Sequence, residues 1–594
     1  ATANEYQQGD DVPLFANKIG PFANPSEQYE YYELPFCSPE KEFRKRHTFG
    51  EVLGGDRMMK TLFSLPFKEN FESKKLCSYK LSVTDVKDFR RAIKQDYYFE
   101  FIYDDLPVWG FIGETGVDEN QETSYHLFTH YLFDIQYNGD QVIEINWKYD
   151  TDPEHLLDIT EDRETPVVFR YSARWTPTET DFDDRLGKYQ EQLLPQHLEI
   201  HWFSIFNSFV TVLLLTGFLA TILMRVLKND FTRYARAEEE EAAEETEETG
   251  WKLVHGDVFR FPVHPTTFCA VVGNGAQLFA LSLGILLLAV FGVFYPGNRG
   301  GLFVAAILLY AFTTVVCGYT ANSLFKKFGG ENWVWCTVFA WLFFFGPFFM
   351  VGTFLNFVAV AYKSSTALPF GTVVVIVLIM SLISFPLTVV GGIAGRNWVL
   401  TPLHTPCIES SPHSPSAIAP LRAMQAAPFE APCRTTKVPR EIPALPLYRQ
   451  GGAQILMAGF LPFSAIYIEL YYVFAAIWGH KLYTLYGILL LVFVILIIVT
   501  SFITIALTYF QLAIEDHRWW WRSVFCGGST GLFVFAYCVF YYNARSQMTG
   551  FMQGAFFFGY MGLICFGFSL MLGTVGFTSS LVFVKYIYRS IKCD

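Results

Sequence analysis

The chain has 594 residues, of which 52% are hydrophobic and 60 are phenylalanine. This composition is too apolar for a soluble protein of one or two ordinary domains, and it indicates a membrane protein. The charge is unevenly distributed: residues 1–203 hold 38 acidic and 21 basic residues, whereas the rest of the chain holds 18 and 23. We therefore expect the two parts to face different surroundings.

The acidic segment 1–203 is predicted to be a β-rich, sandwich-like domain. Strands are predicted at 97–103, 127–137, 141–149 and 166–175. In QVIEINWKY (141–149), the residues at 143, 145, 147 and 149 share one apolar face, which is the period of a half-buried strand. Asn138-Gly139 between two strands favours a tight hairpin turn. Because the chain opens on Ala1-Thr2-Ala3, we expect that a secretory signal has been removed and that the domain is lumenal.

Two pairs of residues in this domain are candidates for covalent or metal cross-links. Cys37 and Cys77 are its two cysteines, and an oxidising compartment allows either a disulfide between them or two buried free thiols. His126 and His130 have the spacing of a metal pair, but a rise of ~3.3 Å per residue puts them roughly 13 Å apart on a strand. No metal site is therefore predicted.

Nine apolar stretches are long enough to cross about 30 Å of hydrocarbon. They lie at 204–224, 267–295, 302–324, 333–361, 371–394, 453–477, 483–509, 522–543 and 551–584. The predicted fold is a polytopic α-helical membrane protein in which nine transmembrane helices follow the β-rich domain. A loop at 225–266 separates the first span from a membrane domain at 267–584, and a second loop at 396–452 interrupts that domain.

The distribution of lysine and arginine predicts the orientation. With residues 1–203 in the lumen, nineteen of these cations fall in cytosolic segments, and four fall in short lumenal loops, namely Arg299, Lys363, Lys481 and Arg545. Cations near the ends of spans resist translocation, so this bias favours a cytosolic tail at 585–594.

Glu469 is the one acidic residue placed deep inside a predicted span. A carboxyl group is costly there, so we expect it to face the bundle interior or a water-filled cavity. Its candidate partners are Asn274, Gln277, Asn322, Asn356 and Gln553. Glu469 either contacts a cargo helix or an ion, or makes a structural hydrogen bond between helices.

Small residues recur in the last span, at Gly554, Gly559, Gly562 and Gly567. They let helix backbones approach closely, which serves either packing within the bundle or a groove for another helix. The acidic run at 238–248 is predicted to be a solvated linker. The triplet Trp519–Trp521 is predicted to anchor a span end at the lipid headgroups.

No P-loop, G-x-S-x-G, H-E-x-x-H motif or DxD-like pair lies in a suitable sequence context. The protein is therefore predicted not to be an enzyme, and neither a cofactor nor a nucleic-acid partner is expected.

Long blocks of unusual composition run through the whole chain. They are GDDVPLFANKIGP (9–21), YYELPFC (31–37), DDLPVWGFIG (104–113), HWFSIFNS (201–208), GWKLVHGDVFRFP (250–262), APCRTTKVPREIP (431–443), LPFSAIYIELYYVFAAIWG (461–479) and EDHRWWWRS (515–523). In these blocks the chain resembles the nonaspanins, also called the transmembrane nine superfamily or 70-kDa endomembrane proteins. The resemblance implies a lumenal domain, nine helices and a role in surface delivery of membrane proteins with glycine-rich transmembrane helices.

Residues 398–428 depart from the family pattern, in which a short linker joins the flanking blocks. Their composition, rich in proline, serine and alanine, cannot build a core. The segment is either a disordered cytosolic loop or a retained non-coding stretch of the gene.

The last three residues, Lys592-Cys593-Asp594, match the terminal Lys-x-Asp/Glu signature of the family. This signature resembles a retrieval signal read by the COPI coat, which implies retention in the Golgi. A cation two residues before paired carboxylates makes a compact bipolar ligand.

The leading functional hypothesis is a multi-pass protein of Golgi and endosome membranes that binds and sorts other membrane proteins. Its expected partners are the COPI coat, membrane-protein cargo with glycine-rich helices, and the lipid bilayer. The alternative is a transporter or channel in which Glu469 and the intramembrane amides line a path for a small solute or ion.

Overall fold

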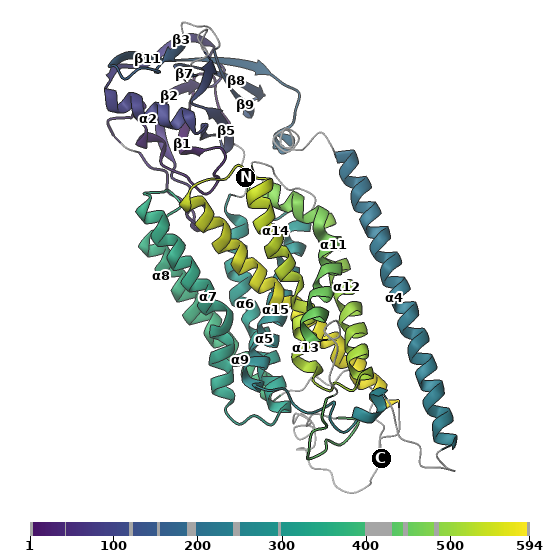
Figure 1. The fold of residues 1–594 in the computed structure, drawn as a ribbon. Helices are drawn as coiled ribbons and strands as arrows, with labels where there is room; N and C mark the ends of the chain where they lie inside the picture. Colours follow the sequence, from purple (N-terminus) through teal and green to yellow (C-terminus); the bar gives the residue numbers. More distant parts are fainter. Residues whose placement is uncertain are drawn as a thin grey trace.

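The computed structural model describes residues 4–41, 43–117, 123–150, 155–186, 198–240, 250–294, 299–397, 431–442, 450–479 and 486–590. Within these ranges a β-rich domain precedes a bundle of long helices and lies at one end of it (Figure 1). We call the opposite end of the bundle the far end. The predicted insertion at 398–428 and residues 241–248 of the acidic run lie outside the described residues.

Three sheets make up the β-rich domain. The first has the strand order β2-β1-β4-β5, formed by β1 (Asp11–Pro21), β2 (Met59–Pro66), β4 (Tyr97–Tyr103) and β5 (Leu106–Phe111). The second has the order β3-β11-β8-β9, formed by β3 (Phe71–Leu81), β8 (His130–Asn138), β9 (Gln141–Tyr149) and β11 (Thr165–Pro177). The third has the order β10-β7-β6, formed by β6 (Gly113–Val117), β7 (Thr123–Phe128) and β10 (Leu156–Asp158). Two short helices, α1 (Phe49–Leu53) and α2 (Val83–Lys94), complete the domain.

The two four-stranded sheets pack against each other through aromatic side chains. Phe63 on β2 lies against Phe101 of its own sheet and against Tyr131, Phe133 and Tyr171 of the other sheet, with ring centroids 5.2 to 6.0 Å apart. Such rings bury large apolar areas and favour edge-on contacts. The predicted β-rich, sandwich-like domain is confirmed.

The predicted strands agree with the structure at three of four places. The stretches 97–103 and 141–149 are β4 and β9, and 166–175 lies inside β11. The single strand predicted at 127–137 is wrong, because the chain leaves the third sheet at Phe128 and enters the second at His130. The hairpin is confirmed, since Asn138 pairs with Gln141 and Gly139 has φ +58°.

Strand β9 is covered on both faces, although its sequence alternates. Glu144 is 3% exposed, so the face predicted to be polar and open is buried at this point. The residues that follow β11 fold back here, and Arg185 donates a hydrogen bond to the carbonyl of Val142 at 3.3 Å. Contacts from a distant segment therefore override the local pattern.

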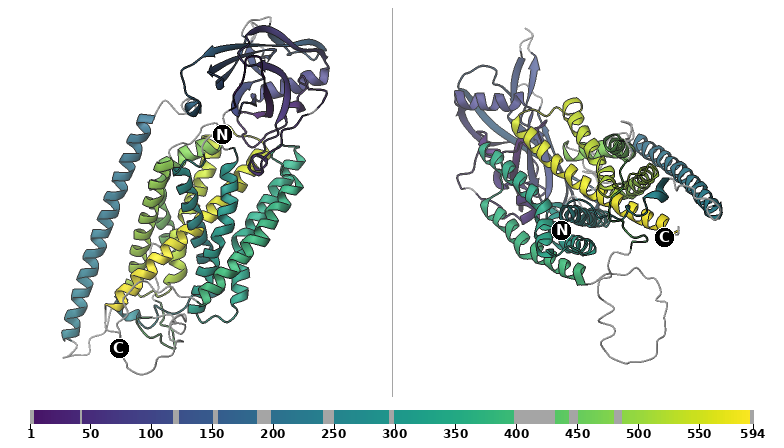
Figure 2. Two further views of the ribbon diagram at one scale, coloured as in Figure 1. Left: turned by 180° about the vertical axis from the view of Figure 1, so that it is seen from behind. Right: turned by 60° about the horizontal axis from the view of Figure 1, so that its bottom comes forward.

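The described residues contain nine helical segments that are long and apolar enough to cross a membrane. They are α4 (Leu198–Glu240), α5 (Pro265–Val290), α6 (Gly301–Lys327), α7 (Trp333–Ala361), α8 with α9 (Phe370–Ile379 and Phe385–Asn397), α11 (Gly451–Ile477), α12 (Tyr486–Ala513), α13 with α14 (Trp519–Gly528 and Thr530–Ala544) and α15 (Phe551–Arg589). A π-helical turn, Met380–Ser384, joins α8 to α9. Each helical segment overlaps one predicted span, and α4 stands at one side of the bundle (Figures 1 and 2).

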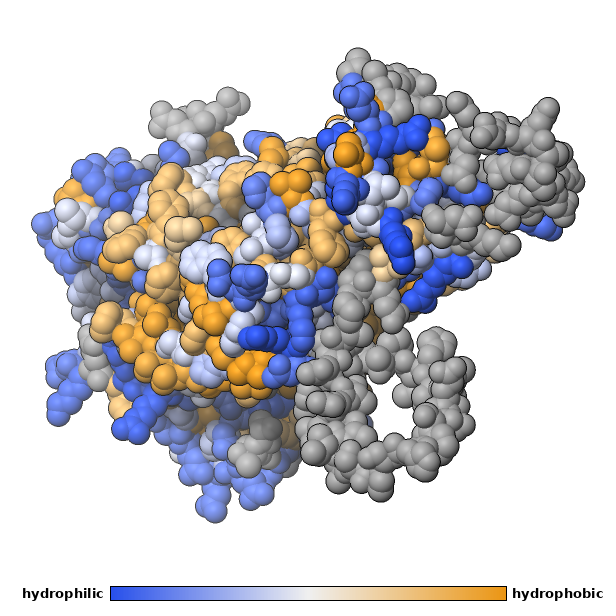
Figure 3. All heavy atoms as spheres, turned by 90° about the horizontal axis from the view of Figure 1, so that it is seen from below, coloured by the Kyte–Doolittle hydropathy of each residue, from blue (hydrophilic) through white to orange (hydrophobic). Residues whose placement is uncertain are grey.

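The far end of the bundle is capped by residues that precede α5. Trp519 and Trp520 are 0% and 3% exposed, and the Trp519 indole donates to the carbonyl of Val258 at 2.8 Å. The prediction of headgroup anchoring is wrong for Trp519 and Trp520, because these two rings fill the contact between α13 and this segment. Figure 3 views the molecule from this end, where hydrophilic and hydrophobic surfaces lie side by side.

A buried cluster of charges joins the β-rich domain to the bundle. Arg299, which precedes α6, lies 2.9 Å from Glu100 of β4 and 3.6 Å from Asp56. Lys18 of β1 lies 3.5 and 3.6 Å from the same two carboxylates. Asn17 donates to both carboxylates, at 2.8 and 2.9 Å. Each buried carboxylate thus has two cations and an amide, which offset its loss of hydration.

Close backbone contacts complete this junction. The carbonyl of Gln28 accepts hydrogen bonds from the Ser365 amide at 2.8 Å and from the Ser364 hydroxyl at 2.6 Å. Gly300 has φ +69°, and a Cβ atom there would lie 2.1 Å from the backbone of Gly50. Only glycine fits both the dihedral angle and the distance.

Replacing Arg299 by alanine is expected to lower the free energy of unfolding by about 3–5 kcal/mol, because it leaves two buried carboxylates with one cation fewer. Lys45→Ala removes an exposed pair with Asp105 and should cost less than about 1 kcal/mol. Thermal unfolding of the full chain in detergent measures both. Equal losses in the two variants would contradict the role given to Arg299.

The charge cluster is expected to withstand mild acid. Burial raises the pKa of Glu100, but Lys18 and Arg299 outweigh it and lower that pKa from 4.5 to about 2. A lowered carboxyl pKa adds stability that is present above the ordinary value and is lost as the pH falls through the folded value. The difference in unfolding midpoint between wild type and Glu100→Gln should therefore stay constant from about pH 7 to about pH 5, and should shrink below about pH 4. A difference that already shrinks between pH 7 and pH 5 would refute this assignment.

Candidate functional site

Glu469 lies in a pocket between three helices at the side of the bundle. On α11 it shares a buried face with Pro462 and Ile466, at helical spacing, and it is 4% exposed. The pocket is lined by Phe209 and Val212 of α4, Ala465, Ile468 and Glu469 of α11, and Leu491, Val492 and Ile495 of α12. Glu469 is thus an acidic group within an otherwise apolar lining.

Helix α4 forms the outer wall of this pocket. Phe209, Val212 and Leu219 pack against a cluster that includes Ala458 and Ile495. On its other side α4 exposes large apolar side chains, among them Leu214 and Phe218, which are 69% and 68% exposed. Such a surface suits lipid, so α4 separates the pocket from the surrounding bilayer.

The lower half of α4 is held by polar contacts near the far end. The carboxylate of Asp230 accepts hydrogen bonds from the Trp251 indole at 3.2 Å and from the Tyr509 hydroxyl. The carbonyl of Trp251 accepts in turn from the Tyr588 hydroxyl at 2.6 Å. These bonds connect α4 to the residues before α5, to α12 and to α15.

The amides predicted as candidate partners of Glu469 bind other groups. Asn274 donates to the carbonyls of Ala270 and Ala340, both at 2.8 Å. Asn322 donates to the carbonyl of Gly318 at 3.0 Å and to the Thr337 hydroxyl at 2.9 Å. The remaining three candidates also bind other groups. Gln277 donates to the Tyr310 carbonyl, whereas the side-chain oxygens of Asn356 and Gln553 accept from the backbone amides of Leu368 and Ser26. These amides therefore hold the bundle and the junction together.

The volume of the pocket limits its chemistry. The cavity measures about 20 Å³, which is room for one water molecule but not for a larger solute. A carboxyl group beside such a cavity can exchange hydrogen bonds with water or with a polar group of a neighbouring helix. The geometry supports a site for helix contact better than a path for solutes.

The four candidate glycines of α15 have different surroundings. A Cβ atom at Gly559 would lie 3.1 Å from Leu355, and one at Gly567 would lie 3.2 Å from Phe344, so both positions are used by packing against α7. A Cβ atom at Gly554 would lie 3.3 Å from the Tyr542 hydroxyl. A Cβ atom at Gly562 would have no heavy atom of the described residues within 4 Å, so this glycine is the one of the four that faces open space.

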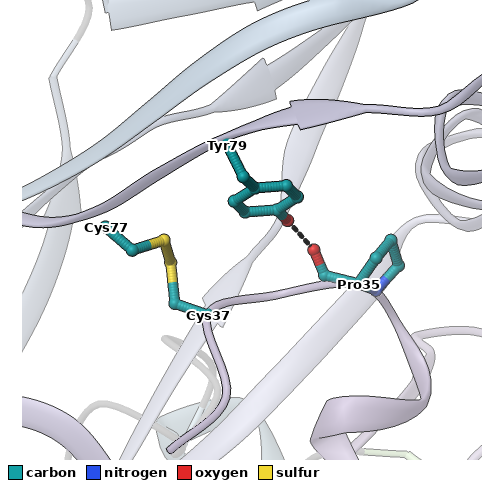
Figure 4. The surroundings of a disulfide bond; sticks show 4 residues. All are labelled: Pro35, Cys37, Cys77 and Tyr79. Carbon is teal, nitrogen blue, oxygen red and sulfur yellow. Dashed lines mark hydrogen bonds between the residues drawn. A yellow bond between two sulfur atoms is a disulfide. The ribbon is translucent and has the colours of Figure 1, made fainter.

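The remaining candidate residues lie away from the pocket. Cys37 and Cys77 form a disulfide in the β-rich domain, next to a hydrogen bond from the Tyr79 hydroxyl to the carbonyl of Pro35 (Figure 4). Lys592, Cys593 and Asp594 lie outside the described residues. His130, Asp150 and His155 are the described residues that could hold a metal ion, and they too belong to the β-rich domain.

Sequence reasoning missed the charge cluster at the junction. By sequence Arg299 is only a cation in a short loop, although that loop lies between two predicted spans on the side of the acidic domain. The block HGDVFR likewise has no role assigned from sequence. In the structure Asp257 of this block accepts hydrogen bonds from Arg260 at 2.7 Å, from Thr436 at 3.0 Å and from the Arg440 amide at 3.1 Å.

A β-rich domain docked on a bundle with nine candidate spans among the described residues defines a multi-pass membrane protein. A family model described as Endomembrane protein 70 matches residues 28–551. The chain is 55% identical to Transmembrane 9 superfamily member 3 and 56% identical to member 2 of Arabidopsis thaliana, covering 100% of this chain and 96% of each relative. It is 45% identical to Transmembrane 9 superfamily member 1 of Bos taurus, covering 99% of this chain and 94% of that protein.

The chain therefore belongs to the Endomembrane protein 70 family, the transmembrane 9 superfamily, and the resemblance seen in the sequence is confirmed. No solved structure matches it. The names of these relatives denote membrane proteins and state no enzymatic activity.

Proposed function

We propose that this protein binds other membrane proteins within the bilayer and sorts them between Golgi and endosome membranes, without catalysing a reaction. The observation that carries the proposal is the pocket between α4, α11 and α12, where the buried carboxyl group of Glu469 lies in an apolar lining at the side of the bundle. A helix that diffuses in the bilayer would reach this site by replacing the upper half of α4, which forms the outer wall of the pocket.

The chemistry of the pocket suits a helix with small residues. Association of helices in lipid depends on close packing and on hydrogen bonds between helices, because lipid tails are as apolar as leucine. A glycine-rich helix brings its backbone near the partner, and Glu469 offers a hydrogen-bonding group at the contact. The apolar residues around it, such as Leu491 and Ile495, supply the packing surface.

The proposal includes an orientation and a coat partner. We place the β-rich domain in the lumen and the C-terminus in the cytosol, because the Lys/Arg bias of the loops favours this arrangement. The terminal Lys592, Cys593 and Asp594 would then be accessible to the COPI coat, which returns the protein and its cargo to the Golgi.

Transport of a solute has less support. A cavity of about 20 Å³ is far smaller than a permeation path, and the amides that were candidates for lining one bind other groups. The described residues therefore favour binding of a helix over conduction.

Glu469→Leu is expected to lower cargo binding about 3- to 10-fold, since a hydrogen bond between helices in lipid contributes roughly 0.6–1.5 kcal/mol. The measurement is photo-crosslinking from a probe at Leu491 to a reporter protein with a glycine-rich transmembrane helix. Glu469→Gln keeps a hydrogen-bonding group and should retain more adduct than Glu469→Leu.

Two matched controls make this experiment specific. A probe at Leu378 on α8 is 47% exposed, close to the 44% of Leu491, but lies away from the pocket. The second control is the same reporter with its glycines replaced by leucine. Equal adducts from the two probe positions, or from the two reporters, would refute the proposed binding site.

Replacing Lys592 and Asp594 by alanine is expected to move the protein from the Golgi to later membranes and to abolish binding of its tail peptide to COPI. The paired charges form the ligand, so Lys592→Arg should keep much of the binding. Fluorescence microscopy and a coat-binding assay measure the two effects. Unchanged localisation and unchanged binding together would remove the coat partner from the proposal.

A further inference from the structure

Two histidines and an aspartate converge in the β-rich domain. His130 begins β8, Asp150 directly follows β9, and His155 directly precedes β10. The Nδ1 atom of His130 lies 3.5 Å from Nδ1 of His155 and 3.2 Å from Oδ2 of Asp150. The same Asp150 oxygen lies 2.8 Å from Nδ1 of His155. Three atoms of the kinds that bind metals thus face one another.

These separations match the edges of a tetrahedral zinc site. Zinc binds imidazole nitrogen and carboxylate oxygen at roughly 2.0–2.2 Å, which puts neighbouring ligands of a tetrahedron about 3.3–3.5 Å apart. The three observed distances of 3.5, 3.2 and 2.8 Å require at most a small outward movement of Asp150. No large rearrangement is needed to place one ion among the three atoms.

The surroundings fix one ligand and leave the site open. Nε2 of His130 lies 2.8 Å from the Ser172 hydroxyl, which is held in place by the Ser73 amide at 2.9 Å. Such a partner on the second ring nitrogen orients a metal-binding imidazole and sets its tautomer. The side chain of His130 is 6% exposed, whereas those of Asp150 and His155 are 23% and 26% exposed. The open side leaves room for water as a fourth ligand.

We propose that His130, Asp150 and His155 form a binding site for a divalent transition metal ion, with Zn²⁺ as the best match. Two imidazoles and one carboxylate are a ligand set that zinc accepts. The bound ion would connect the start of β8 with the ends of the segment between β9 and β10, so it would stabilise this edge of the β-rich domain.

The alternative is a metal-free hydrogen-bonded cluster in which Asp150 accepts from both imidazoles. Burial lowers the pKa of His130, and the neighbouring His155 lowers it further, against the opposing effect of Asp150. The positive charge of Arg170 also lowers the pKa of His130.

The test uses the full chain, purified in detergent with an affinity tag that contains no histidine and without chelators. Equilibrium dialysis against micromolar free Zn²⁺, followed by mass spectrometric metal analysis, gives the zinc content per chain. We expect wild type to hold one zinc more than His155→Ala or Asp150→Asn. Loss of one of the three ligands should weaken zinc binding at least about 100-fold. This is more than the loss of a residue that only supports a ligand would cause.

His126→Ala is the matched control. His126 belongs to the same domain and bonds to Ser124 at 3.0 Å, outside the cluster, so this variant should keep the zinc. Added zinc should raise the unfolding midpoint of wild type and of His126→Ala, but not that of His155→Ala. Equal zinc content in wild type and His155→Ala, or no zinc in wild type, would overturn the proposal and leave the hydrogen-bonded cluster.

Discussion

The placement of the β-rich domain on the bundle depends on a small set of buried charges. Removing a carboxylate from water costs several kcal/mol, and for Glu100 and Asp56, Arg299 supplies one of the two cations that offset this cost. Arg299 comes from the bundle, whereas Lys18 and both carboxylates come from the domain. The pairing therefore favours one orientation of the domain, because a rotated domain would leave the two carboxylates with Lys18 as their single cation. The contact of Gly50 with Gly300 is the steric counterpart of this pairing.

Inside the bundle, close approach of backbones takes the place of the hydrophobic drive that lipid does not provide. A Cβ atom at Gly275 of α5 would lie 2.2 Å from the carbonyl of Leu570, and one at Gly531 of α14 would lie 2.7 Å from the carbonyl of Cys565. Both contacts are with α15, which has 39 residues and is about 58 Å long at 1.5 Å per residue. This helix contacts the β-rich domain through Gln553 and the far-end cap through Tyr588. It is the element that links the two ends of the molecule.

The parts that could be predicted from the sequence are those imposed by a single local constraint. Hydrocarbon thickness imposes the length of each span, and the cost of a carboxyl group in lipid predicts that Glu469 is buried. The partners of a buried group depend on which helices are neighbours, and hydropathy does not contain that information. For this reason Asn274 and Asn322 are plausible partners of Glu469 by sequence, although they bond within their own part of the bundle. The junction escapes prediction because a loop arginine has the same local pattern whether it faces water or a carboxylate.

The histidines illustrate the same limit at short range. The separation of roughly 13 Å predicted between His126 and His130 assumes that both belong to one strand. The chain changes sheets at Thr129, whose hydroxyl donates to the carbonyl of His155 at 2.7 Å. That change brings His130 to His155, 25 positions later. Distances along an assumed strand could not show this.

The two halves of α4 are attached to the bundle by different forces. Near the far end, Asp230 is hydrogen-bonded to α12 and to the residues before α5. Beside the pocket, Phe209 and Val212 contact the bundle through apolar surface. In water, separating such surfaces would be opposed by the hydrophobic effect, but in a bilayer lipid tails or another helix replace the lost contacts. In the proposed function an incoming helix would therefore exchange with the upper half of α4 at little cost, while Asp230 keeps the lower half in place. Selectivity would then come from Glu469, because a polar or close-packing partner is required there and lipid supplies neither.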